Sequence, residues 1–146
     1  MNYLDQIIKK WLNDAVQELP AESAVNISSA FQAVGGIATS DLIALYRKIG
    51  GMQTMDNNYF RLWSLAEIRE ENAVQSSHGI LFADYLIDSW CYRARPISED
   101  ESEIYVDFFD GSSPALIGNN LNEFLLACLN DPELVLHHPR SINNDA

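Results

Sequence analysis

The first third of the chain has apolar residues at the spacing of α-helices. From Tyr3 to Leu19 they recur three and four positions apart, with charged residues between them, and Pro20 ends the run. Two further runs of this kind each end at a pair of glycines, which are common at helix C-termini. The pattern predicts three amphipathic helices, over residues 3–19, 22–34 and 39–49.

After Gly51 the apolar spacing shortens to that of β-strands. The predicted strands cover residues 59–63, 80–82, 86–95, 104–109 and 115–117. Ser64 and Glu67 have the spacing of a capping box for a short helix through Asn72. A closing helix is expected to begin at Asn119 or Asn120, with a last turn from Asp131 through Leu136.

This order predicts the α+β class, with one antiparallel sheet packed against N-terminal helices and a closing C-terminal helix. A length of 146 residues fits one domain. We expect that domain to span residues 1–138, and residues 139–146 to form a flexible tail.

Charge is distributed unevenly along the chain. The net charge is −12, and residues 74–146 hold twelve acids against three bases, whereas residues 1–73 hold nine acids against six bases. Phosphate contacts need clustered Lys and Arg, so direct binding to nucleic acid is not expected. A field of this sign favours a basic partner, although acidity also simply keeps a domain soluble.

The location expected from the sequence is cytoplasmic. Charged residues interrupt the N-terminal segment, which is therefore not a secretion signal, and the apolar run at 80–87 is too short to cross a membrane. Cys91 and Cys128 are too far apart for a CxxC motif, so we expect two reduced, buried thiols.

No motif in the sequence predicts catalysis, a metal site or a cofactor. Asp107 and Asp110 are three apart and face opposite sides of a strand, although Asp84 and Asp88 could approach each other across a turn. Three histidines without ligand spacing do not make a zinc site: His78, His137 and His138. Neither a GxSxG nor a GxGxxG motif is present. We therefore expect no enzymatic activity.

Five segments together resemble the SUKH superfamily, which includes yeast Smi/Knr-type regulators and bacterial immunity proteins. They lie within residues 22–136 and read SDLIALYRKIGGM, FRLWSLAEIREEN, LFADYLIDSWCYRAR, EIYVDFFDG and NLNEFLLACLNDPELVL. The chain departs from the family at Ala38-Thr39, where Leu-Pro is usual, and at Ile49-Gly50-Gly51, where Asn-Gly-Gly is usual. The resemblance implies an α+β sheet without enzymatic activity and with a protein partner.

In bacterial members that implied partner is a toxin domain, often a nuclease, which the immunity protein blocks by direct binding. The yeast members suggest the alternative of an intracellular scaffold or regulatory adaptor without a toxin.

We expect the partner to bind the acidic half of the chain. An anchor at Trp90 or Tyr92 is expected to slow dissociation, and carboxylates are expected to steer a basic protein towards it. The predicted steering residues are Asp84, Asp88, Glu99, Asp100, Glu101 and Glu103. The alternative reading is that Trp90 belongs to the core and the turn at 98–103 is only solvated.

Overall fold

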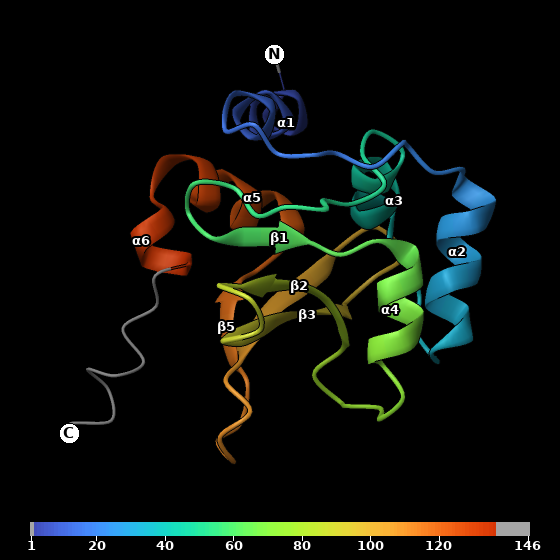
Figure 1. Ribbon diagram of the computed structural model, residues 1–146. Coiled ribbons are helices and arrows are strands. Elements are labelled where there is room, and N and C mark those ends of the chain that lie inside the picture. The colour runs from blue at the N-terminus through green and yellow to red at the C-terminus, as the bar shows by residue number, and fades with distance from the viewer. Residues whose placement is uncertain (1, 137–146) are drawn as a thin grey trace.

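A five-stranded antiparallel sheet forms the centre of the structure (Figure 1), a computed structural model that describes residues 2–136. Each strand pairs with its neighbours in sequence, so the spatial order is β1-β2-β3-β4-β5. The strands are β1 (Phe60–Leu62), β2 (Ile80–Tyr85), β3 (Trp90–Pro96), β4 (Ser102–Asp107) and β5 (Ala115–Gly118). The predicted α+β class with an antiparallel sheet is confirmed.

Helices supply the other half of the core. They are α1 (Tyr3–Asn13), α2 (Ala24–Ala33), α3 (Ser40–Tyr46), α4 (Leu65–Glu71), α5 (Leu121–Asn130) and α6 (Pro132–Val135). Figure 1 shows α1 at the top of the molecule, with α5 between it and the sheet, and α2 beside α4. Trp11 of α1 stacks on Phe60 of β1, which also meets Phe124 of α5, so the first and last parts of the described chain share one core.

Helix starts follow the predicted capping residues closely. Ser64 and Glu67 form the complete capping box of α4, because each side chain accepts a hydrogen bond from the backbone N–H of the other. The Asn120 side chain caps α5 by accepting from the backbone N–H of Glu123 at 2.8 Å. These caps depend on neighbours three residues apart, so they could be predicted from the sequence.

The first helix is shorter than the pattern predicts. It ends at Asn13, and Ala15 takes a left-handed conformation with φ of 63°. The backbone beyond it pairs with residues 50–53: the Leu19 N–H donates to the Gly51 carbonyl at 2.9 Å, and a β-bridge joins Glu18 to Met52. The prediction of helix up to Leu19 was wrong, because these distant partners satisfy the same backbone groups.

The strand predicted at 86–95 was also wrong at its start. Residues 86–89 form the turn between β2 and β3, shown in yellow in Figure 1, and β3 begins at Trp90. This turn contains Asp88 and Ser89, but none of the Asn-Gly, Asp-Gly or Gly-Gly pairs that most strongly mark a hairpin in a sequence.

Cys91 and Cys128 are free and buried, as predicted. Burial raises the pKa of both thiols, which keeps them protonated. Within residues 2–136, every helix is too short or too polar to cross a membrane. His137, His138 and the tail predicted at 139–146 lie outside the described residues.

Candidate partner-binding surface

Four aromatic rings form a continuous chain across one end of the sheet. Tyr59 meets Tyr85 edge-on with ring centroids 6.0 Å apart, and Tyr85 stacks on Trp90 at 4.6 Å. Trp90 in turn meets Phe108 edge-on at 5.3 Å. We call the end of the sheet formed by Tyr59, residues 85–90 and residues 108–109 the aromatic end.

Strand register explains this chain of rings. Tyr85 and Trp90 are direct partners across β2 and β3, and side chains of paired residues lie on the same face of the sheet. The Trp90 indole N–H donates to the Tyr92 hydroxyl at 3.3 Å, which satisfies its one polar group. Trp90 is therefore half-buried, with one edge of the ring fixed against the core.

Tyr92, the alternative anchor, lies inside the core. It is fully buried and packs against Phe60 and Phe124. Burial raises the pKa of its phenol well above the usual value. Tyr92 is therefore not available on the folded surface, and of the two predicted anchors only Trp90 reaches it.

The backbone of the aromatic end is strained. Five of the six non-glycine residues with left-handed φ in the described chain lie here, with φ between 50° and 67°: Tyr59, Leu86, Ile87, Asp88 and Phe109. This conformation costs L-residues about 1–2 kcal/mol each, and it is least favourable for a β-branched residue such as Ile87. Hydrogen bonds hold the turn in place, because the Leu86 and Ser89 N–H groups donate to the Tyr59 and Tyr85 carbonyls at 2.8 and 3.0 Å.

The strained residues turn apolar side chains towards solvent. Ile87 is 78% exposed and Phe109 56% exposed, and Leu86 is also exposed. Strain of this kind concentrates where the surrounding structure enforces it for function. In the turn at 86–88, the left-handed backbone exposes the side chains of Leu86 and Ile87 beside the carboxylate of Asp88.

A row of ion pairs crosses the opposite face of the sheet. Three arginine–carboxylate pairs make up this row: Arg61–Asp84 at 3.1 Å, Arg93–Asp107 at 2.9 Å and Arg95–Glu103 at 2.8 Å. Asp84 is buried and also accepts from the Trp63 indole N–H at 2.6 Å. Burial raises the pKa of Asp84, and the bond from Trp63 and the charge of Arg61 only partly offset this effect.

A hollow of about 450 Å³ lies between this row and the strained turn. The predicted residues Asp84 and Asp88 both line this hollow, together with Arg61 and Ile87. Asp84 is committed to its partners inside the fold, whereas Asp88 is exposed on the turn. Between residues 2 and 136, no three His, Cys, Asp or Glu side chains gather as they would around a metal ion.

The other predicted acids lie at the opposite end of the sheet. Glu99, Asp100 and Glu101 are exposed in the turn between β3 and β4, and Glu103 is half-buried beside Arg95. β3 separates them from Trp90 by six steps of about 3.4 Å, or roughly 20 Å. The structure therefore does not bring the eight predicted residues into one surface.

The acidic turn is also more ordered than a solvated loop. The backbone carbonyls of Glu99 and Asp100 accept from the N–H groups of Ser40 and Asp41 at 3.0 Å, so the turn is fastened to the start of α3. The Ser40 hydroxyl donates to the Asp100 carboxylate at 2.9 Å. Carboxylates held at a helix start are favourably placed for the helix dipole.

Sequence reasoning missed the exposed apolar residues of the aromatic end. One signal for Phe109 was present: Phe108 and Phe109 are adjacent at the end of the predicted strand, where neighbouring side chains are expected to point to opposite faces, so they are not both expected in the helix-covered core. Leu86 and Ile87 had no such signal, because the apolar run continues through them from β2.

Comparison with known proteins adds no family assignment. A scan against models of protein families finds no match to this chain. A search of curated proteins finds no matching relative. The partner-binding roles of the residues above therefore stay predictions.

Proposed function

We propose that this protein is a non-enzymatic binding domain of the SUKH type that captures a basic protein at its aromatic end. The observation that carries the proposal is the strained turn at 86–88, which exposes Leu86 and Ile87 beside Asp88. A left-handed conformation at three consecutive residues costs about 3–6 kcal/mol, a large share of the roughly 5–15 kcal/mol by which domains are stable. Burial of these side chains by a partner offsets that cost.

The sign of the charge supports a basic partner. Arg61, Arg93 and Arg95, the arginines of the sheet, each face a carboxylate within 3.1 Å, so their positive charge is locally balanced. Asp88 then adds negative charge to the turn itself, in a protein with a net charge of −12. Such a field speeds the association of a basic protein by roughly 10 to 1,000 times.

The partner we propose is a toxin domain that the protein neutralises by direct binding. The resemblance to SUKH immunity proteins supports this choice. A nuclease fits best among toxins, because it presents Lys and Arg to phosphate, and an inhibitor that covers those residues offers carboxylates instead.

Co-expression with the toxin encoded beside its gene tests this function. The protein is expected to restore growth, and the double variant I87S/F109S is expected to lose that protection. The matched control is L12S/V25S, because Leu12 and Val25 are comparably exposed on α1 and α2. Continued killing in the presence of folded, abundant wild-type protein contradicts toxin neutralisation and favours the adaptor function.

The two variants test toxin neutralisation and the location of the binding surface separately. If wild type, I87S/F109S and L12S/V25S all restore growth equally, toxin neutralisation stands and the aromatic end is not the binding surface. Circular dichroism of each purified variant verifies that loss of protection is not loss of folding.

A further inference from the structure

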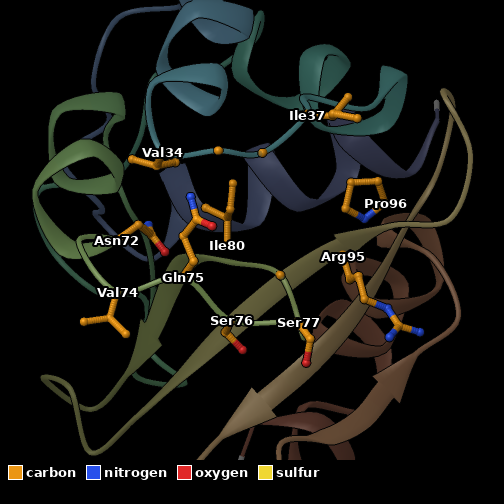
Figure 2. Close-up of a pocket in the computed structure, with 13 residues that line it drawn as sticks. Val34, Ile37, Asn72, Val74, Gln75, Ser76, Ser77, Ile80, Arg95 and Pro96 are labelled. Atoms are coloured by element: carbon orange, nitrogen blue, oxygen red, sulfur yellow. The ribbon is translucent and has the colours of Figure 1, made fainter.

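A second hollow, of about 230 Å³, lies at the end of the sheet opposite the aromatic end. Its walls come from the C-terminal end of α2, from the loop between α4 and β2, and from the last residues of β3. Figure 2 shows Val34 and Ile37 along one side and Ser76 and Ser77 along the other, with Ile80 between them. We call this site the α2 hollow.

Glycines at its edge build the shape of the α2 hollow into the backbone. A Cβ on Gly36 would lie 1.8 Å from the Ile80 Cδ1 atom, so the chain after α2 passes close to the start of β2 and a larger residue there would displace the Ile80 side chain. A Cβ on Gly79, which has a φ of +101°, would lie 2.2 Å from the Ala94 carbonyl oxygen. The close approach of Gly79 to β3 is therefore fixed by backbone atoms.

Apolar side chains surround this hollow and remain open to solvent. Val74 is 84% exposed and Ile37 60% exposed, and Ile97, next to Pro96 in the wall, is also exposed. The volume is below the roughly 300–1,000 Å³ of most small-molecule sites. It is suited to one large side chain of a polypeptide.

Negative charge borders the α2 hollow on two sides. The acidic turn with Glu99 and Glu101 follows directly after Pro96, and its bonds to Ser40 fix it near the segment that carries Ile37. Glu71, exposed at the end of α4, comes directly before Asn72 of the wall. Arg95 is the only Lys or Arg among the lining residues, and it pairs with Glu103 at 2.8 Å.

We propose that the α2 hollow binds an extended basic peptide segment of a protein by enclosing one of its apolar side chains. The flanking Lys or Arg residues of that segment then face the acidic turn and the end of α4. This proposal is separate from toxin neutralisation at the aromatic end, since it concerns the opposite end of the sheet and any protein with such a segment.

A nuclear magnetic resonance titration with the peptide acetyl-Lys-Lys-Leu-Lys-Lys-amide tests the proposal. Saturable shifts are expected at the backbone amides of residues 34–37 and 74–79, with a dissociation constant on the order of 1 mM. The same peptide with Gly in place of Leu, and the peptide with Glu in place of every Lys, are expected to bind at least several times more weakly.

Matched variants locate the charge contribution. E99Q/E101Q removes two exposed carboxylates beside the hollow and keeps Asp100, which bonds to Ser40. We expect it to weaken binding of the leucine peptide about three- to tenfold. D131N/E133Q removes the same charge near α6 and is expected to leave binding unchanged, whereas V74S is expected to weaken it.

Three results overturn the proposal. The first is the absence of saturable shifts at 34–37 and 74–79, and the second is equal binding of the leucine and glycine peptides. The third is equal weakening by E99Q/E101Q and D131N/E133Q, which reduces the interaction to net charge. Shifts confined to residues 85–90 and 108–109 place the peptide at the aromatic end instead.

Discussion

The indole ring of Trp90 lies parallel to the phenol ring of Tyr85, with centroids 4.6 Å apart and planes inclined by 5°. Phe108 meets the same indole edge-on at 5.3 Å. Trp90 therefore links β2 to the segment that follows β4, while one part of it reaches the surface. A change at this residue acts on the sheet and on any protein bound there.

Trp90→Ala is expected to lower the free energy of unfolding by about 1–3 kcal/mol, because it removes the stack on Tyr85 and the contact with Phe108. Trp90→Phe keeps a ring in place and is expected to lower it by less than about 1.5 kcal/mol. Urea unfolding followed by circular dichroism measures both changes. With the toxin bound, only Trp90→Ala is expected to speed dissociation markedly; a slow, unchanged dissociation rate excludes Trp90 as the anchor.

Ile87→Gly is expected to stabilise the protein by about 0.5–1.5 kcal/mol, because glycine adopts the left-handed conformation without steric cost. The lost side chain is 78% exposed, so little core packing is lost with it. The same change is expected to weaken partner binding. Ala15→Gly is the control, since Ala15 has a φ of 63° after α1 and is not one of the residues that form the aromatic end. It is expected to stabilise the protein without a change in its affinity for the partner. If both variants bind the partner with equal affinity, the strained turn at 86–88 is not retained for binding.

Asp84→Ala is expected to lower the free energy of unfolding by about 2–4 kcal/mol. It leaves the Trp63 indole N–H without its buried acceptor and removes one partner of Arg61. Asp84→Asn is expected to cost much less, since it keeps an acceptor oxygen and removes a carboxylate whose pKa burial already raises. Thermal unfolding of the two variants compares them. Equal losses mean that the charge, rather than the hydrogen bond, holds this site together.

The two carboxylates beside Arg61, those of Glu67 and Asp84, are expected to make the stability of the fold depend on pH in opposite directions. Burial alone raises the pKa of Glu67, but hydrogen bonds from Arg61 and Ser64 outweigh it and hold the pKa below its usual 4.5. Its stabilising contribution is therefore present above pH 4.5 and is lost as the pH falls below it. For Asp84 the pKa is raised, so the folded state loses stability as the pH rises from 3.8 through the folded pKa.

The stability difference between wild type and Glu67→Gln is thus expected to shrink on acidification. Relative to Asp84→Asn, the wild type is instead expected to gain stability as the pH falls. Denaturant titrations at several pH values between about 3 and 6 measure both differences, a range that spans the usual carboxylate pKa values. If the two differences change in the same direction, one of the assigned shifts has the wrong sign.

Gly79→Ala is expected to destabilise by about 2 kcal/mol or more, because its Cβ would lie 2.2 Å from a backbone carbonyl oxygen that cannot move aside. Gly111→Ala is the matched control. Gly111 also has a positive φ, of +90°, but no atom lies within 4 Å of its Cβ position, so only conformational strain of about 1 kcal/mol is expected. Thermal unfolding distinguishes the two costs.

The sequence predicted those features that depend on near neighbours. Ser64 and Glu67 are three residues apart, and their capping box formed as expected. The helix predicted up to Leu19 failed because residues 17–19 pair with residues 50–53, which local spacing does not reveal. In the same way, nothing in the apolar run of β2 indicated that Leu86 and Ile87 leave the strand in a left-handed turn.

The candidate site could be predicted only in part for a related reason. Trp90 was singled out by its type and by Asp88 nearby, and both lie at the aromatic end. The acids at 99–103 are close to Trp90 in sequence, yet an intervening strand carries them roughly 20 Å away. Asp84 is also acidic, but the cross-strand register that pairs it with Arg61 could be read only from the structure.

The contact between α1 and α5 has a consequence for synthesis on the ribosome. Leu4, Ile7 and Trp11 are the buried residues of α1, and α1 packs against α5, which begins at Leu121. At about 5–20 residues per second, more than a hundred residues take on the order of ten seconds to follow. During that interval the apolar stripe of the nascent helix lacks the part of its cover that α5 provides, although Trp11 can already meet Phe60 of β1. This segment is therefore open to chaperones that bind short apolar helices until α5 has been made.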